Sequence, residues 1–389
     1  MAAAEDLLVG ENQTSQRGLG ALDWQTPKTS QNSFDVVREK VARREHLRLV
    51  PDKTTKRARN IPNDQDDPGY DVIDLKKVQV MSVGSIFVPN FGLLELNSWS
   101  RHQFGSLMGV RWNKFFAGQS PDEIQKAIRN HLKARGPVLA KFVARGFDKG
   151  ETPKNKHSVG ILRGMVGPNY HEIRDDRVFD RIHKVMGPQL NDMHFMMASF
   201  KPNASHFFLV YNEPFDATQS GIAPRGANDT YFFGSRMGNS EVGGRTLTLQ
   251  SWFVKFVCSN GMITGMEDGP LLKKRHIRID DDVLDGAIDS AFKELPVRRN
   301  QIIEHSTKLH NIKLDDPKEE MKRFLRGESK YLVAAAEKAW ELEGEPDNAF
   351  GVAQALARVA VSARGNRDKQ EDLEKLAGKY VDDVVKRNS

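Results

Sequence analysis

The chain has 389 residues, of which 39% are hydrophobic and 28% are charged, and its formal net charge is +6. This composition is typical of a globular protein with an apolar core, and the excess of Lys and Arg favours anionic partners such as nucleic acid. The single cysteine, Cys258, excludes an intramolecular disulfide and a cysteine-rich zinc site, and we expect it to be buried. No segment has the roughly 18 apolar residues of a membrane helix, and the first residues lack a signal-peptide pattern. We therefore expect a cytoplasmic protein with no membrane partner.

Residues 1–75 are predicted to form a flexible, basic N-terminal arm. Gln, Ser, Asn, Gly and Pro are frequent there, and apolar residues rarely recur with a helical or strand period. One short helix is expected from Ser33 to His46. Lys and Arg then cluster between Arg43 and Arg59, which indicates either a solvated tail or an arm that contacts phosphates.

Residues 76–300 are predicted to form an α+β core with a mainly antiparallel sheet and flanking helices. One helix start is marked by a capping box, in which Ser120 is followed by Pro121 and, three residues after the Ser, by Glu123. The expected helices are 98–108, 120–135, 175–186 and 281–295, and the expected strands are 78–89, 137–147, 158–165, 194–200 and 206–211.

Residues 148–157 form a Lys-rich connection between two of these strands. The connection carries Lys154 and Lys156. Such a segment is either a solvated hairpin tip or a loop that contacts phosphates, and the sequence leaves both interpretations open.

The stretch from Tyr231 to Thr264 is the most distinctive part of the chain. It predicts a strand, a polar loop and a second buried element, because glycines punctuate its first half and a long apolar run follows. The expected loop holds Arg236, Glu241 and Arg245, and its hydrogen-bond donors suit an anion or a nucleic acid. A plain hairpin connection is the alternative.

A basic segment, Lys273 to Arg275, precedes three consecutive carboxylates, Asp280 to Asp282. We expect the carboxylates to form the acidic first turn of the following helix rather than a metal site, because adjacent helical residues point in different directions. The chain lacks the phosphate-binding string of Gly, four residues, Gly-Lys and Ser or Thr. No nucleotide, metal or other cofactor is therefore expected. Residues 301–389 are predicted to form a helical C-terminal region.

Two segments resemble a phage and plasmid family, the domain of unknown function nine-three-two. NSEVGGRTLTLQSWFVKFVCSNGM is similar to that family's Asn-Ser-x-x-Gly-like turn, short Arg-containing strand and Val-Cys-Ser-Asn-Gly-Met segment. LRGMVGPNYHEIRDDRVFDRI is similar to its strand and turn leading into a helix, with Tyr170, Ile173 and Asp176 in matching places. The resemblance covers roughly residues 80–365. The family has no settled activity, so the resemblance implies no catalytic residues.

The expected fold also resembles, in outline, the ATP-independent single-strand annealing recombinases, which form rings or filaments on DNA. Our first hypothesis is therefore a non-enzymatic, ATP-independent phage or plasmid protein of the host-cell cytoplasm. As a homo-oligomer, it would bind and anneal single-stranded DNA in recombination or replication. The predicted binding residues are cations for the phosphates and two aromatic residues for base stacking: Lys154, Lys156, Tyr231, Phe233, Arg236, Arg245, Lys273, Lys274 and Arg275.

Two alternatives stay open. The chain is alternatively a phage interaction or virion-associated protein without affinity for DNA, in which case its positive charge is incidental. It is alternatively a metal-dependent nuclease, for which Asp280 to Asp282 are the candidate ligands.

Overall fold

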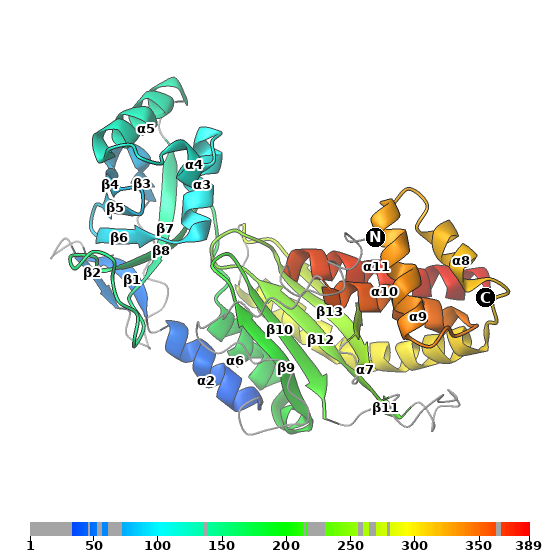
Figure 1. Cartoon of the computed structure of the whole chain (residues 1–389). Coiled ribbons are helices and arrows are strands. Elements are labelled where there is room, and N and C mark those ends of the chain that lie inside the picture. The colour runs from blue at the N-terminus through cyan, green and yellow to red at the C-terminus, as the bar shows by residue number, and fades with distance from the viewer. Residues whose placement is uncertain are drawn as a thin grey trace.

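The structure is a computed structural model that describes residues 33–45, 47–52, 57–60, 72–135, 138–212, 215–216, 230–255, 260–263, 270–277, 281–362 and 367–389. These residues form two lobes, each with its own β-sheet and hydrophobic core (Figure 1). The fold is α+β with mainly antiparallel sheets, flanking helices and a helical C-terminal region, as the sequence predicted. Cys258, Asp280 and residues 1–32 lie outside the described residues.

The smaller lobe is a sheet with helices on one face. Its strand order is β2-β1-β7-β8-β6-β5-β4, and β3 pairs with β7 beside β1. β6 and β8 run parallel, whereas the other named pairs are antiparallel. The strands are β1 (Arg48–Asp52), β2 (Arg57–Asn60), β3 (Val72–Asp74), β4 (Gln79–Ser82), β5 (Ser85–Val88), β6 (Gly92–Leu96), β7 (Leu139–Arg145) and β8 (Gly160–Val166).

Helices α3 (Ser98–Met108), α4 (Trp112–Phe115) and α5 (Pro121–Arg135) cover one face of this sheet. The predicted capping box is present at α5, where the Ser120 backbone N–H donates to the Glu123 carboxylate at 2.7 Å. In return, the Glu123 N–H lies 3.4 Å from the Ser120 hydroxyl oxygen. The strand expected from 78 to 89 is instead the β4–β5 hairpin, because the chain turns at Val83 and Gly84.

The larger lobe contains an antiparallel sheet in the order β14-β13-β12-β10-β9, with β11 paired to β12 and β15 paired to β13. Its strands are β9 (Met193–Phe200), β10 (Ser205–Tyr211), β11 (Phe215–Asp216), β12 (Thr230–Asn239), β13 (Leu247–Lys255), β14 (Asn260–Ile263) and β15 (Leu272–Lys274). Its helices are α2 (Phe34–Glu45), α6 (Asp175–Met186), α7 (Asp281–Asn311), α8 (Pro317–Phe324), α9 (Lys330–Leu342), α10 (Ala349–Ser362) and α11 (Arg367–Arg387). Two 3₁₀ turns, η1 (Leu75–Lys77) and η2 (Gly187–Asp192), complete the described elements.

The first face of the larger sheet carries most of the core. Phe207, Phe233, Leu249 and Phe253 point from its strands into one cluster with buried side chains of α2, α6, α7 and the C-terminal helices. α10 and α11 also contact β14 at the edge of the sheet. The second face therefore lies on the other side of β10, β12 and β13, where alternate residues such as Phe208 point.

The described part of the predicted N-terminal arm is packed rather than loose. α2 matches the helix expected from Ser33 to His46, and its Phe34, Val37 and Val41 are buried in the core of the larger lobe. Leu49 of β1 and Ile73 of β3 are buried in the core of the smaller lobe. Along the chain, the residues of the smaller lobe thus lie between α2 and the remaining elements of the larger lobe. The expected single core of residues 76–300 is therefore divided between two lobes.

α7 is longer than the helix expected to end at Leu295. It continues through Pro296 to Asn311, although proline removes a backbone hydrogen bond within a helix. Leu295, Ile302 and Leu309 recur every seven residues and are all buried, so tertiary packing holds the helix together across the proline. In the described part of the chain, no helix combines the length and apolarity that crossing a membrane requires.

Candidate nucleic-acid interface

The segment expected to be a glycine loop is mostly strand. β12 continues to Asn239 and pairs with β13 as far as Gly238 opposite Thr248. A Cβ atom on Gly234 would lie 2.0 Å from the Leu209 carbonyl oxygen, and one on Gly238 would lie 2.5 Å from the Arg245 Cζ. These glycines therefore permit close packing within the sheet, whereas the sequence interpretation assigned them to a turn.

The β12–β13 turn is the joint between the two lobes. Val242 packs against Val143 and Val166 of the smaller sheet. Its carbonyl oxygen accepts hydrogen bonds from the Trp99 indole and the Gln103 amide of α3, both at 3.1 Å. The backbone and side chain of this one residue thus fix the turn to the smaller lobe.

Glu241 extends the same joint with a buried ion pair. Its carboxylate pairs with Arg163 of β8 and accepts the Asp175 backbone N–H of α6 at 3.0 Å. Asp175 is itself buried, and its carboxylate accepts from Ser205 at 2.5 Å and from Asn239 at 2.8 Å. Glu241, which the sequence placed in an anion-binding loop, therefore connects elements of the two lobes.

A stacked pair of rings supports the joint from one side. Tyr170 donates to the Ser240 carbonyl at 2.6 Å, and its ring lies parallel to the His276 imidazole with centroids 5.0 Å apart. The His276 Nδ1 lies 3.4 Å from the Ile173 backbone N–H. Burial lowers the pKa of His276 to about 4, so the ring is neutral near pH 7 and Nδ1 accepts this hydrogen bond.

Arg236 and Arg245 lie on the second face of the larger sheet and pair with α11. Arg236 is only 2% exposed. Its guanidinium forms an ion pair with Glu374, lies 3.4 Å from Glu371, and sits 5.0 Å from the centroid of the Phe208 ring. Arg245 donates to the same Glu371 carboxylate at 2.9 Å. Two arginines of the sheet thus face two carboxylates of one helix.

Neighbouring groups complete this network. Arg245 also donates to the His206 Nδ1 at 3.2 Å and to the Thr248 hydroxyl at 3.2 Å. Lys375 pairs with Glu371 at 2.6 Å, and the Gln370 amide donates to Glu374 at 2.7 Å. In Figure 1, α11 begins beside the sheet, where these residues lie, and ends at the far side of the helical region.

The network sets the charge of its titratable groups. Burial works against ionisation of Glu371, but Arg236, Arg245 and Lys375 outweigh it and hold the pKa of Glu371 at about 2. Burial, together with Arg245 and Arg236, holds the pKa of His206 well below its usual value. At neutral pH Glu371 is therefore ionised and His206 is neutral, which agrees with His206 accepting from Arg245.

The remaining predicted residues are dispersed. Phe233 is buried on the first face of the larger sheet, where base stacking cannot reach it, and the side chain of Tyr231 lies outside the described residues. Lys273 is exposed and pairs in register with Thr248 on the second face, whereas Lys274 is half-buried and pairs with Leu247 on the first. The other three predicted cations are exposed: Arg275 after β15, and Lys154 and Lys156 between β7 and β8.

The sequence interpretation missed Glu371 and Glu374. A usable signal existed in α11, where Gln370, Glu374, Ala377 and Val381 follow one another at helical spacing and are all buried. Polar residues at the beginning of the buried side of a helix indicate buried partners of opposite charge, because burying an unpaired carboxylate costs free energy. The partner positions, Arg236 on β12 and Arg245 in the β12–β13 turn, are more than a hundred residues away in sequence, so the pairing itself was not predictable.

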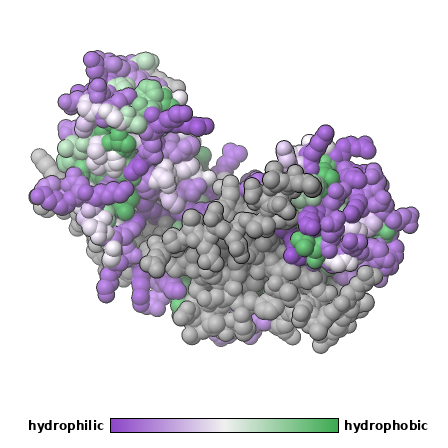
Figure 2. Space-filling view, viewed as in Figure 1, coloured by the Kyte–Doolittle hydropathy of each residue, from purple (hydrophilic) through white to green (hydrophobic). Residues whose placement is uncertain are grey.

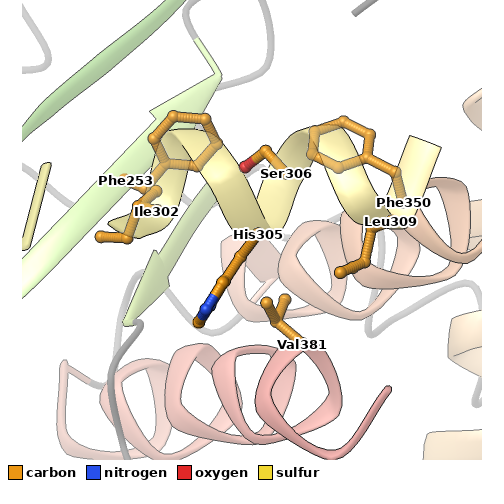
Figure 3. A pocket seen from close by; sticks show the side chains of 7 residues that line it. All are labelled: Phe253, Ile302, His305, Ser306, Leu309, Phe350 and Val381. Atoms are coloured by element: carbon orange, nitrogen blue, oxygen red, sulfur yellow. The ribbon is translucent and has the colours of Figure 1, made fainter. Parts of the chain in front are cut away.

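The described residues offer little to a small ligand or a metal. No three His, Cys, Asp or Glu side chains among them lie close enough to hold a metal ion. Asp281 and Asp282 begin α7, which agrees with the prediction of an acidic first turn. A small apolar pocket lies between β13, α7, α10 and α11, lined by Phe253, Ile302, His305, Ser306, Leu309, Phe350 and Val381 (Figure 3). Its volume of about 10 Å³ is no more than one water molecule needs.

Comparison of the chain with protein-family models, with curated proteins and with solved structures found no significant match. The resemblance to the domain of unknown function nine-three-two therefore stays a prediction. A functional assignment has to come from the residues of this chain.

Proposed function

We propose that this chain binds single-stranded nucleic acid, DNA in the first place, on the outer face of the smaller sheet. We define the outer face as the side of that sheet opposite α3 to α5. The observation that carries the proposal is that Lys154 and Lys156 are exposed on the loop that contacts Glu95 of this face, which also carries the exposed Phe87. A basic edge beside a stacking surface is the usual arrangement for sequence-tolerant binding of single strands.

Strand alternation defines the outer face. Ile86, Val88, Leu94 and Leu96 point into the core, so Phe87, Leu93 and Glu95 point outwards. Phe87 pairs in register with Leu93 and is 38% exposed. An exposed aromatic ring on a sheet is available to stack on a base, which is worth roughly 1–3 kcal/mol per base.

The loop of residues 148–157 is fixed to Glu95, which lies on the same face as Phe87. The Asn155 backbone N–H donates to the Glu95 carboxylate at 3.1 Å, and Val159 continues the contact by donating to the Leu93 carbonyl at 2.9 Å. Glu95 pairs with Ser85, two residues before Phe87. With strands about 4.8 Å apart and a rise of about 3.3 Å per residue, the Cα atoms of Glu95 and Phe87 lie about 8 Å apart. Lys154 and Lys156 flank Asn155, so they lie on the part of the loop that contacts this face.

The loop keeps an excess of positive charge. Arg145 and the loop lysines Lys149, Lys154 and Lys156 are four cations, against the carboxylates of Asp148 and Glu151. Glu151 is held by Arg145 through two hydrogen bonds, at 2.6 and 2.7 Å, so it does not compete for the lysines. In the view of Figure 2, the visible side of the smaller lobe is mostly hydrophilic, with hydrophobic residues in small patches. A strand with stacked bases and negative phosphates fits such a surface.

The proposal includes annealing by a homo-oligomer, ring or filament, that uses neither nucleotide nor metal. Contacts to the phosphates leave those bases that are not stacked on Phe87 free to pair, and several copies in a row hold a long strand extended. These further features rest on the proposed binding.

The test is fluorescence anisotropy with a labelled oligonucleotide of about 30 nucleotides, single-stranded and duplex, at about 50 and 200 mM salt. We expect preference for the single strand, and affinity that falls with salt. Lys154→Ala with Lys156→Ala is expected to lower the salt slope by about 0.7 for each phosphate that the variant no longer neutralises. Phe87→Ala is expected to cost roughly 1–3 kcal/mol with little change in slope.

The matched control is Lys126→Ala with Lys133→Ala. Both lysines are on α5, which covers the opposite face of the same sheet. This control has the same net charge as the loop variant and is expected to bind like the wild type. An equal loss of affinity in both variants would show only an unspecific effect of net charge. Absence of binding by the wild type at low salt would favour the virion or partner-protein alternative.

A further inference from the structure

One edge of the smaller sheet is blocked by a single side chain. β4 is the last strand in the order of this sheet, so no strand of the described residues pairs with its outer side, which we call the β4 edge. We propose that the β4 edge is a strand-pairing surface for a second copy of this chain, and that Gln125 of α5 blocks it. The proposal rests on the hydrogen bonds of this edge and not on the binding of DNA proposed above.

The Gln125 amide takes the place of a neighbouring strand. Its oxygen accepts the Val80 backbone N–H at 2.6 Å, and its nitrogen donates to the Val78 carbonyl oxygen at 3.2 Å. Backbone groups of alternate residues point to the same side of a strand, so Val78 and Val80 both present theirs at the β4 edge. An added strand would bond to these same backbone groups. The Gln125 amide and an added strand therefore exclude each other.

The sequence of the β4 edge lacks the usual charged protection against pairing. Residues 78–94 contain no Asp, Glu, Lys or Arg. Natural proteins protect exposed strand edges with charged side chains, proline, bulges or a covering element. The strand at the other edge of the same sheet, β2, carries Arg57 and Arg59. Protection of the β4 edge therefore falls to the Gln125 amide and to the register shift within β4.

The chemistry of the β4 edge fits a second copy of the same strand. β4 carries no charge that would select a charged peptide, and its Met81 is an apolar side chain that is 49% exposed. Two copies of β4 can pair antiparallel about a two-fold axis, so that each brings the same backbone groups to the other. The strand has only four residues, so the contact is small, and the pairing is weak as long as Gln125 has to be displaced.

The direct test removes the Gln125 amide and measures self-association. Gln125→Leu keeps the approximate size of the side chain and removes both hydrogen bonds to the β4 edge. Size-exclusion chromatography with light scattering compares the full-length variant and wild type over a range of concentrations, without nucleic acid. We expect the dissociation constant of the dimer to fall by about tenfold or more, because neither copy has to give up two hydrogen bonds before it pairs. A folded variant that associates like the wild type would overturn the proposal.

The matched control is Gln119→Leu. It makes the same amino-acid change in the connection before α5, where the Gln119 amide donates to the Phe115 carbonyl oxygen at 3.0 Å. We expect this control to associate like the wild type. Equal association of the two Leu variants would show a general effect of the added apolar side chain, and the proposal would then be wrong.

A second change identifies the surface that pairs. Met81→Lys adds a charge to β4, and the added charges of two copies repel each other when the copies pair through this strand. Gln125→Leu with Met81→Lys is therefore expected to associate like the wild type, whereas a dimer that persists would place the contact elsewhere. Hydrogen exchange followed by mass spectrometry is expected to show slower exchange in residues 79–82 of the Gln125→Leu dimer. Slower exchange confined to other segments would contradict the proposal.

Gln125→Met keeps the test decisive if the Leu variant does not fold. Methionine is unbranched like glutamine and removes the same two hydrogen bonds, so we expect a similar rise in association. Far-UV circular dichroism shows whether each variant is folded, and a folded Met variant that associates like the wild type would overturn the proposal. Because no sample contains DNA, these results stand apart from the test of the proposed function.

Discussion

The two cationic surfaces of this protein contain similar residues in opposite states. At the outer face of the smaller sheet, Lys154 and Lys156 are exposed on the loop whose Asn155 contacts Glu95, and Phe87 of the same face is 38% exposed. On the second face of the larger sheet, Arg236 also lies over an aromatic ring, that of Phe208, but carboxylates of α11 neutralise both Arg236 and Arg245. Positive charge in a sequence therefore does not indicate an available surface. The availability depends on a helix that is distant in the chain.

We call the second face of the larger sheet, where α11 covers Arg236 and Arg245, the closed surface. The largest effect is expected from breaking its ion pairs. Glu374→Ala leaves the buried Arg236 without its main carboxylate, which costs about 3–5 kcal/mol for ion pairs of this kind. Urea unfolding followed by far-UV circular dichroism measures the change. Asp372→Asn, an exposed position on the same helix, is expected to change stability by less than about 0.5 kcal/mol. A loss of stability below about 1 kcal/mol for Glu374→Ala would show that Arg236 does not depend on this carboxylate, and that α11 covers the second face less firmly than the contacts indicate.

The next largest effect on stability is expected from a change of pH. It acts on His206 and Glu371 on the second face of the larger sheet and on His276 at the joint between the lobes. His276 has a folded pKa of about 4, below its unfolded value, so the unfolded state binds the proton first. Its contribution to stability is fully present above about pH 6.5 and is lost as the pH falls towards 4, by about 2 kcal/mol at pH 5. His206, whose pKa is also lowered, acts in the same direction, and Glu371 adds a loss only below about pH 4.5.

Urea unfolding at about pH 7.5, 6 and 5 measures this slope. His276→Gln is expected to flatten it, because the glutamine does not titrate. A stability that is constant between about pH 7.5 and 5 would contradict the burial of both histidines.

A smaller effect is expected at the joint that separates the two surfaces. Arg163→Ala removes the ion-pair partner of Glu241, but the carboxylate keeps the Asp175 N–H as a donor. We expect a loss of about 2 kcal/mol, within the range for leaving a buried polar group partly satisfied. Differential scanning calorimetry tests this, and separation of one transition into two would show that the joint couples the lobes. A single unfolding transition whose midpoint falls by less than about 1 °C would show that the contacts of Val242 hold the two lobes together without the ion pair.

The smallest effect on stability is expected at the outer face of the smaller sheet. Lys154→Ala with Lys156→Ala removes two exposed side chains that belong to neither core, so the free energy of unfolding is expected to stay within about 0.5 kcal/mol. The same variant is the one expected to lose affinity for DNA. A large loss of stability would instead assign these lysines to the fold and remove them from the proposed interface.

Local chemistry made several elements predictable. The capping box at Ser120 and Glu123 marks the start of α5, and the apolar spacing in residues 175–186 gives α6 its observed bounds. The strands around His194 and His206 were also expected where β9 and β10 lie. Each of these signals depends on residues within one or two turns of each other, so the sequence carries it completely.

The candidate sites show where local signals end. Gly234 and Gly238 indicate a turn by their local preference, but they serve close packing with β10 and with Arg245. Glu241 and Arg236 were grouped as parts of one polar loop, whereas the first connects the two lobes and the second pairs with α11. For both ion pairs the partner lies more than 70 residues away, so no local pattern contains it.

The sequence by itself determined the α+β class, the positions of most helices and strands and the excess of positive charge. Those properties follow from side-chain period, capping and composition, which act over a few neighbouring residues. Only the tertiary structure decided that the core divides into two lobes, that the glycine segment is a strand and a joint, and which cations remain open to a ligand. The reason is that burial and ion pairing are set by contacts between distant segments, and the free energy of a charge depends on those contacts more than on its neighbours in the chain.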